Sequence, residues 1–211
     1  MAGNSYLQDY ASSLNRKTAI FPTVLDTDRY QPAPNNNSDK LIIGWIGSPS
    51  TAPYLKTLIP SLTQLGLEGS VLLRVIGGKA PNIPNIEVEE IPWSEETEVH
   101  YINSFDIGVM PLEDDEWSKG KCAFKLLQYM ACELPVIASN VGANIDVVSS
   151  DCGYLVDNDL AWIDAMRSLR DNPEKRSSFG KNGRKKVVQS YSLKSNLPIL
   201  IKAIKNISIK T

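Results

Sequence analysis

The residues best suited to binding a ligand lie in one polar, glycine-containing segment, 114–144. It leads into a short apolar helix expected over 124–131, whose first amides and partial positive charge suit a phosphate group. Lys121 adds positive charge at the same end. The expected start of the helix is formed by Ala123, Phe124, Lys125 and Leu126. The pattern predicts a site for a phosphate-bearing ligand.

Small and polar residues also follow four expected strands, at 41–47, 71–78, 106–112 and 135–139. These residues are Gly47-Ser48, Gly77-Gly78, Pro111 and Ser139-Asn140. Strands and helices alternate along the chain, which predicts an α/β fold with a doubly wound parallel sheet. Ligands of such sheets bind at the carboxyl ends of the strands, where glycine lets a backbone approach them closely. The four strand ends therefore predict one ligand crevice.

The remaining elements follow from hydrophobic periodicity and from the turn-forming residues between them. Further strands are expected at 18–22, 86–91 and 153–156, and further helices at 6–14, 52–66, 94–104, 158–170, 174–190 and 194–207. The segment 31–40 contains two prolines and three asparagines and reads as a linker or exposed loop, with a boundary near Asp39.

Composition and missing motifs exclude several classes of protein. The 211 residues are 42% hydrophobic and 22% charged, with a net charge of -2, which excludes a protein that coats nucleic acid. No apolar run approaches the roughly 20 residues of a membrane helix, and no signal peptide is expected, so we predict a cytoplasmic protein. Dinucleotide, phosphate-loop and serine-hydrolase motifs are absent. The lone histidine, His100, and the three scattered cysteines predict no metal site, and the acids 114–116 read as a solvated loop.

Charge is distributed unevenly. Residues 80–118 hold eleven acids and no lysine or arginine, whereas the chain from Arg167 onward holds twelve lysines and arginines against Asp171 and Glu174. One interpretation is that these are solvated helix faces. The other is a basic region that contacts an acidic partner domain or the anionic inner face of a membrane.

Several segments together resemble one family. KLLQYMA (125–131), followed by LPVIAS (134–139) and Val141-Gly142, resembles the donor-site signature of group 1 retaining glycosyltransferases. GWIGSPST (44–51) resembles the first strand and loop of their C-terminal domain. These likenesses imply one half of the GT-B arrangement, in which two Rossmann-like domains face each other across a cleft.

Two further likenesses extend the resemblance over essentially the whole chain. FDIGVMPL (105–112) resembles the strand before the signature, and IFPTVLDTDRYQP (20–32) resembles the last strand and exit linker of the family's N-terminal domain. The resemblance implies three parts. They are the tail of the N-terminal domain with its linker (1–39), the donor-binding domain (40–193) and a C-terminal helix (194–211). The acceptor-binding N-terminal domain is otherwise missing.

The resemblance also implies an activity. It is transfer of a sugar from a nucleotide-diphosphate sugar to an acceptor, with the nucleotide sugar as substrate and with no cofactor or metal. The chain by itself is expected to be inactive, because the acceptor residues and any family catalytic histidine would sit on the missing domain. Two other functions stay open, a non-catalytic nucleotide-sugar binding module and a nucleotide-sugar epimerase of the same architecture.

The family's site residues carry over only in part. A family glutamate that binds the ribose hydroxyls corresponds to Gln128, and one that touches the transferred sugar corresponds to Gly120, with Asp115 or Glu116 as substitutes. Many relatives clamp the diphosphate with an Arg and a Lys after the first strand. Here Gly47 is followed by Ser48, Pro49 and Ser50, which shifts that role to Lys125 and the helix amides.

Two residues of the predicted site have further implications. Trp93 resembles the position that lines the nucleobase, although an aromatic packed at the sheet rim is an equal alternative. A neutral amide at Gln128 is expected to bind ribose hydroxyls more weakly than a carboxylate would. From the sequence alone, replacing Gln128 by Glu is therefore expected to tighten nucleotide binding.

Overall fold

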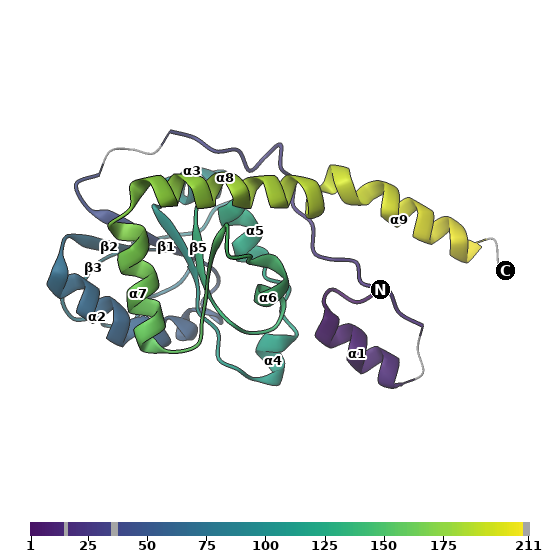
Figure 1. Ribbon diagram of the computed structural model, residues 1–211, viewed down its shortest axis with the longest axis horizontal. Coiled ribbons are helices and arrows are strands. Elements are labelled where there is room, and N and C mark those ends of the chain that lie inside the picture. The colour runs from purple at the N-terminus through teal and green to yellow at the C-terminus, as the bar shows by residue number, and fades with distance from the viewer. Residues whose placement is uncertain (15–16, 35–37, 209–211) are drawn as a thin grey trace.

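The computed structural model describes residues 1–14, 17–34 and 38–208, with side chains up to Lys205 (Figure 1). It confirms the predicted α/β fold, because six parallel strands form one sheet in the order β3-β2-β1-β4-β5-β6. The strands are β1 (Leu41–Ile46), β2 (Val71–Ile76), β3 (Glu87–Ile91), β4 (Ile107–Met110), β5 (Val136–Ser139) and β6 (Gly153–Val156). The central strands are apolar because helices cover both faces of the sheet.

Alternating side chains of each strand point to opposite faces of the sheet and belong to two separate hydrophobic cores. Ile43 and Trp45 of β1 belong to one core, and Ile42 and Ile46 belong to the other. The first core is covered by the 3₁₀ helix η1 (Ala52–Leu58), α2 (Ile59–Glu68) and α7 (Asp159–Arg170). The second is covered by α3 (Glu98–Ile102), α5 (Phe124–Ala131), α6 (Ala143–Val147) and α8 (Pro173–Ser190).

Helix α8 packs closely against the C-terminal end of α5. A Cβ atom added at Gly180 would lie 1.8 Å from the carbonyl oxygen of Glu133, just after α5, so only glycine permits this approach. One turn further along α8, Arg184 donates to the carbonyl oxygen of Ala131 at the end of α5. These contacts fix the position of α5, whose other end faces the predicted crevice.

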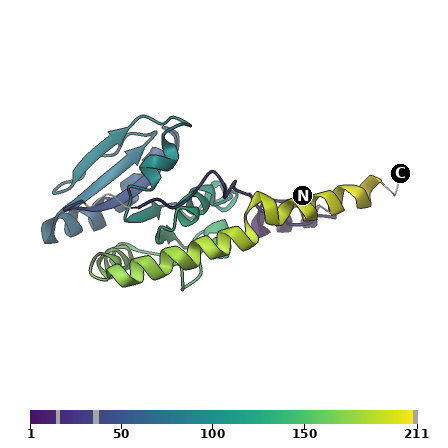
Figure 2. The same ribbon diagram turned by 90° about the horizontal axis from the view of Figure 1, so that it is seen from above.

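The two ends of the chain extend from the same side of this domain. Helices α1 (Ser5–Ser13) and α9 (Leu193–Ser208) lie there together, and α9 runs on beyond α8 (Figures 1 and 2). The amide of Leu25 donates to the carbonyl oxygen of Tyr191, which ties the N-terminal segment to the end of α8. Several apolar side chains of α9 are exposed, including Leu197, Ile201 and Ile204.

Three predicted elements differ from the structure. The strand expected at 18–22 is wrong, because Ile20 forms only an isolated bridge with Ala2 and, among the described residues, belongs to no strand. The helix expected at 52–66 begins as the 3₁₀ helix η1, and its α-helical part starts only at Ile59, which places Pro60 in a first turn where its missing amide needs no partner. The helix expected at 94–104 begins only at Glu98, after a turn in which the Ser94 and Thr97 hydroxyls bond each other.

Other differences arise from segments too short to show a period. Helix α4 (Glu116–Lys119) and helix α6 span four and five residues, and neither was predicted. The linker predicted at 31–40 can be compared with the structure only in part, because residues 35–37 lie outside the described residues. Within the described part of the chain, no helix is long and apolar enough to cross a membrane, and no group of three or more His, Cys, Asp or Glu could hold a metal ion.

Candidate functional site

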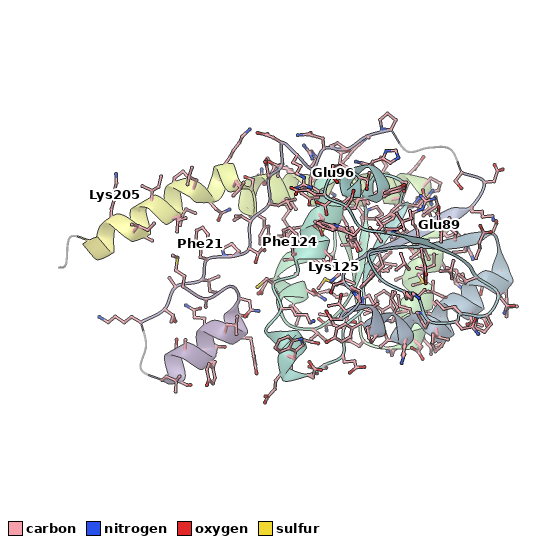
Figure 3. All side chains as sticks on the ribbon, turned by 180° about the vertical axis from the view of Figure 1, so that it is seen from behind. Phe21, Glu89, Glu96, Phe124, Lys125 and Lys205 are labelled. Carbon is pink, nitrogen blue, oxygen red and sulfur yellow. The ribbon has the colours of Figure 1, made fainter. Side chains whose placement is uncertain are left out.

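A pocket of about 590 Å³ lies at the carboxyl ends of β1, β2 and β4, against the N-terminal end of α5. Phe124 and Lys125 lie next to each other at that end of α5 (Figure 3). The pocket is lined by Ile46, Gly47, Ser48, Pro49, Gly77, Trp93, Glu98, Met110, Lys121, Cys122, Ala123, Phe124, Lys125 and Gln128. It lies at three of the four strand ends where the sequence predicts one ligand crevice, whereas Ser139 and Asn140, after β5, line a separate pocket.

Eight of the predicted site residues line this pocket. They are Gly47, Ser48, Gly77, Trp93, Ala123, Phe124, Lys125 and Gln128. Three do not. Ser50 is hydrogen-bonded through its hydroxyl to Ser48, and Leu126 is buried in the core. The amide of Gly120, which follows α4, donates to the carbonyl oxygen of Glu116.

Glycine at position 77 lets three loops meet at the pocket wall. Gly77 has a φ of 76°, and an added Cβ atom would lie 2.4 Å from the carbonyl oxygen of Gly47 and 2.9 Å from Cβ of Trp93. Both the positive φ and the lack of space exclude a side chain. The loops after β1, β2 and β3 therefore approach each other only because residue 77 is glycine.

The start of α5 presents its first amides to the pocket. Ala123 precedes the helix with a φ of 54°, a left-handed conformation that is uncommon for alanine. The amides of Leu126 and Leu127 donate to the carbonyl oxygen of Ala123, whereas those of Phe124 and Lys125 have no hydrogen bond within the described part of the chain. These two donors, together with the helix dipole, make this end of α5 suited to an anion.

Lys125 adds a partly buried cation to this end. Its Nζ lies 5.4 Å from the centre of the Trp45 ring. Burial, together with the nearby charge of Lys121, lowers the pKa of Lys125 to about 8. An anion bound beside Lys125 would favour its protonated form, so the site is suited to a negatively charged group.

Gln128 begins a buried chain of hydrogen bonds at the pocket wall. Its Nε2 donates to the Tyr30 hydroxyl at 3.0 Å, and that hydroxyl donates to the Glu98 carboxylate at 2.5 Å. Glu98 also accepts from Nε1 of Trp93 at 2.7 Å and from the Arg29 guanidinium at 2.7 Å. Sequence reasoning missed Glu98 and Tyr30, because nothing in an acid-rich run or a linker marks the residue that turns inward.

Cys122 is a further residue of the pocket that sequence reasoning did not assign. It is half-buried and free, whereas Cys132 and Cys152 are buried. A second, larger pocket of about 770 Å³ adjoins the first and shares Pro49, Gly77 and Trp93 with it. Trp93, which is 52% exposed, therefore lines both spaces.

Comparison with protein families identifies the chain at this point. The family described as "Glycosyl transferases group 1" matches residues 41–172, which is well over half of the chain. The chain belongs to the group 1 glycosyltransferases. The predicted resemblance is thereby confirmed, and the pocket at the start of α5 lies within the matched residues. No curated protein matches the chain.

Solved structures agree with this assignment. The chain is similar to sucrose-phosphate synthase from Thermosynechococcus elongatus, with a TM-score of 0.76 and 17% identity over 100% of this chain and 58% of that one. It is similar to HepE from Anabaena in complex with UDP and glucose, with a TM-score of 0.76 and 12% identity over 97% and 62% of the two chains. The glycosyltransferase domain thus spans about three fifths of the length of these proteins.

A third structure shows which part of the fold is present. The C-terminal domain of a group 1 glycosyl transferase from Francisella tularensis matches with a TM-score of 0.62 and 18% identity, over 80% of this chain and 99% of that domain. The sheet order of this glycosyltransferase domain is that of a Rossmann-like fold, 3-2-1-4-5-6. The chain therefore has the fold of the C-terminal half of a GT-B glycosyltransferase.

Proposed function

We propose that the chain is the donor-binding domain of a retaining glycosyltransferase, and that its pocket at the start of α5 holds a nucleotide-diphosphate sugar. The observation that carries the proposal is the convergence on one pocket of Lys125, Gln128 and the first two α5 amides, which have no hydrogen-bond partner among the described residues. A diphosphate needs donors and positive charge, and a ribose needs hydrogen-bonding groups. Both requirements are met by backbone amides and side chains of a single helix.

The transfer step would use the positive end of α5. When the bond between the sugar carbon and the diphosphate oxygen breaks, the electron pair leaves with the diphosphate, which gains negative charge. Preorganised amides of Phe124 and Lys125, together with the Lys125 ammonium, would stabilise that charge as it develops. The proposal also includes positioning of the donor nucleotide. Gln128 would bind the ribose, and Trp93 would pack against the nucleobase.

The sugar-side carboxylate of the family has no counterpart at its usual position. Residue 120 is glycine and lies outside the pocket lining. Asp115 uses its carboxylate to accept the amide of Ser118 at the start of α4, a hydrogen bond that lowers the pKa of Asp115. Neither Asp115 nor Glu116 lines the pocket, and we therefore assign donor binding to α5 and not to these two carboxylates.

Calorimetric titration with UDP, GDP and ADP tests the proposal. At least one of them should bind the purified chain, and Lys125→Met should weaken that binding about tenfold or more, because a hydrogen bond to a charged group contributes roughly 1.5–3 kcal/mol. Lys181→Met removes an exposed lysine of α8 as a matched control and should leave the affinity unchanged. Absence of binding, or equal affinities in the wild type and Lys125→Met, would contradict the proposal.

Binding is proposed to need no divalent metal. The positive charge at the diphosphate would come from Lys125 and the α5 amides rather than from an ion. The same titration with and without magnesium should therefore give similar affinities. A tenfold gain in affinity with magnesium would refute this part of the proposal.

A further inference from the structure

The buried network of hydrogen bonds from Gln128 through Tyr30 to Glu98 connects the pocket with the segment around Tyr30, which is far away in the sequence. Tyr30 lies before the sheet, Glu98 begins α3, and Gln128 lies in the second turn of α5. Their side chains belong to residues that are 4%, 5% and 4% exposed, so bulk water does not compete for their hydrogen bonds. Such a network is costly to leave partly satisfied, which makes its directions well defined.

The charge of Glu98 fixes which group donates and which accepts in each hydrogen bond of this network. Glu98 is paired with the Arg29 guanidinium, and an ionised carboxylate can only accept hydrogen bonds. The single proton of Tyr30 must therefore point to Glu98. Burial and the adjacent Glu98 raise the pKa of Tyr30 to about 12, so this proton is retained at neutral pH.

The fixed proton of Tyr30 determines how the Gln128 amide is turned. With its proton committed to Glu98, the Tyr30 oxygen can only accept, and the group of Gln128 that can donate to it is Nε2. The amide oxygen then becomes the atom that Gln128 offers to a ligand in the pocket. A hydroxyl pair that donates hydrogen bonds, as in a ribose, fits this acceptor.

Glu98 has a second effect on the same pocket. Its other oxygen accepts from Nε1 of Trp93, which holds the indole at the pocket wall. The segment that carries Tyr30 is itself anchored, since Arg184 of α8 donates to the carbonyl oxygen of Tyr30 at 2.9 Å. One carboxylate and one phenol thus hold two walls of the pocket.

We propose that Tyr30 and Glu98 are positioning residues that turn the Gln128 amide oxygen toward the ligand, so that the pocket selects nucleotides by their ribose hydroxyls. This inference rests on the proposed function, because it names how that same site recognises its ligand. Nucleotide binding would then depend on the segment around Tyr30 being packed on the domain.

The test compares UDP with 2′,3′-dideoxy-UDP on the purified chain. The wild type should prefer UDP about tenfold, as expected when a hydrogen-bonded hydroxyl is removed from a polar pocket. Tyr30→Phe keeps the ring but removes both hydrogen bonds of the hydroxyl, and it should reduce that preference to about twofold or less. Both nucleotides are titrated into one preparation, so a fraction of unfolded protein lowers the number of sites and not the ratio of affinities.

Two further variants separate positioning from a structural role. Gln128→Leu should abolish the preference by itself, and adding Tyr30→Phe to it should change the ratio no further. Tyr154→Phe removes the hydroxyl of another partly buried tyrosine, which bonds Ser168, and should keep the wild-type preference.

The outcomes distinguish this inference from the proposed function. If the wild type binds none of UDP, GDP or ADP, the proposed function fails and this inference fails with it. If UDP binds but Tyr30→Phe or Gln128→Leu keeps the full preference for the ribose hydroxyls, only the positioning role is overturned.

Discussion

Lys125 is held partly out of water beside an indole ring, and its charge is therefore sensitive to pH in an unusual range. Because burial lowers its pKa to about 8, about half of the side chains are neutral at pH 8 in the free protein. A lysine in water would still be charged there. If Lys125 binds a diphosphate, affinity should fall as the pH rises from about 7 to 9.

The matching measurement is proton uptake on binding. An anion beside Lys125 favours its protonated form, so nucleotide binding near pH 8 should take up at most about half a proton. Calorimetry in buffers of different ionisation enthalpy measures this uptake. Lys125→Arg stays charged over the whole range and should show neither the uptake nor the fall in affinity, and an unchanged profile in that variant would assign the effect to another group.

Gln128 allows a test in which the structure reverses an expectation from the sequence. The family's glutamate at this position suggested that Gln128→Glu would tighten binding. In the structure, a carboxylate there has no hydrogen to donate to Tyr30, and the only proton of Tyr30 is already given to Glu98. The buried tyrosine oxygen would face two carboxylates, an arrangement that costs roughly 1–3 kcal/mol.

Gln128→Glu should therefore weaken UDP binding several-fold and lower the melting temperature. Isothermal titration and a thermal melt on the same preparation measure both effects. Tighter binding by Gln128→Glu would show that Tyr30 turns its proton to residue 128. The donors and acceptors of the hydrogen-bond network would then have to be reassigned.

At the scale of the elements, the contact between α8 and α5 is the one that holds the site in place. Gly180→Ala would set a Cβ atom 1.8 Å from the backbone of Glu133, and we expect it to lower the free energy of unfolding by about 1–3 kcal/mol. Gly183 on the same helix is a matched control, because its Cβ atom would meet only the flexible Met130 side chain, at 3.1 Å.

Gly183→Ala should be neutral or slightly stabilising, since alanine favours a helix by about 0.5–1 kcal/mol over glycine. Urea unfolding of the two variants distinguishes them. Equal effects would mean that α8 can shift away from α5 without cost, and the close packing of the two helices would then not fix the site.

The elements were predictable where a segment has a long period or a continuous apolar run. Strands β1 and β2 are such runs, and the helices over 158–170 and 174–190 have capped starts at Asn158 and Asn172. Segments shorter than two turns, such as α4 and α6, have no measurable period. The segment 18–22 has the local pattern of a strand, but within the described part of the chain it pairs only through the isolated bridge between Ile20 and Ala2.

The site was predictable in its backbone parts and not in its buried polar network. Glycines at strand ends and the start of a helix are local signals, and the structure brings Gly47, Gly77 and Lys125 together at one pocket. Glu98 is one of eleven acids in its stretch, and only tertiary packing turns it inward. Tyr30 lies almost 100 residues from Gln128. Contacts of that kind are not encoded in local spacing.

At the scale of the whole molecule, the chain corresponds to 58% of the sucrose-phosphate synthase structure that it resembles. Under the proposed function, the acceptor would bind to the part of such an enzyme that has no counterpart in these 211 residues. We expect the 211-residue chain to bind a nucleoside diphosphate and to transfer no sugar. An assay that follows UDP released from UDP-glucose, with simple sugars as acceptors, should show only background rates. Transfer above background would place the acceptor site within this chain.

Cys122 gives the pocket a natural chemical label. It is the one cysteine that is not buried, and it lines the pocket beside Lys121 and Ala123. Burial raises the pKa of Cys132 to about 12, so that thiol stays protonated and inert. A thiol-specific disulfide reagent should therefore titrate one fast-reacting group in the folded chain, and a saturating nucleoside diphosphate should slow it. Footprinting of this thiol would report occupancy without any engineered probe, and Cys122→Ser should abolish the fast phase.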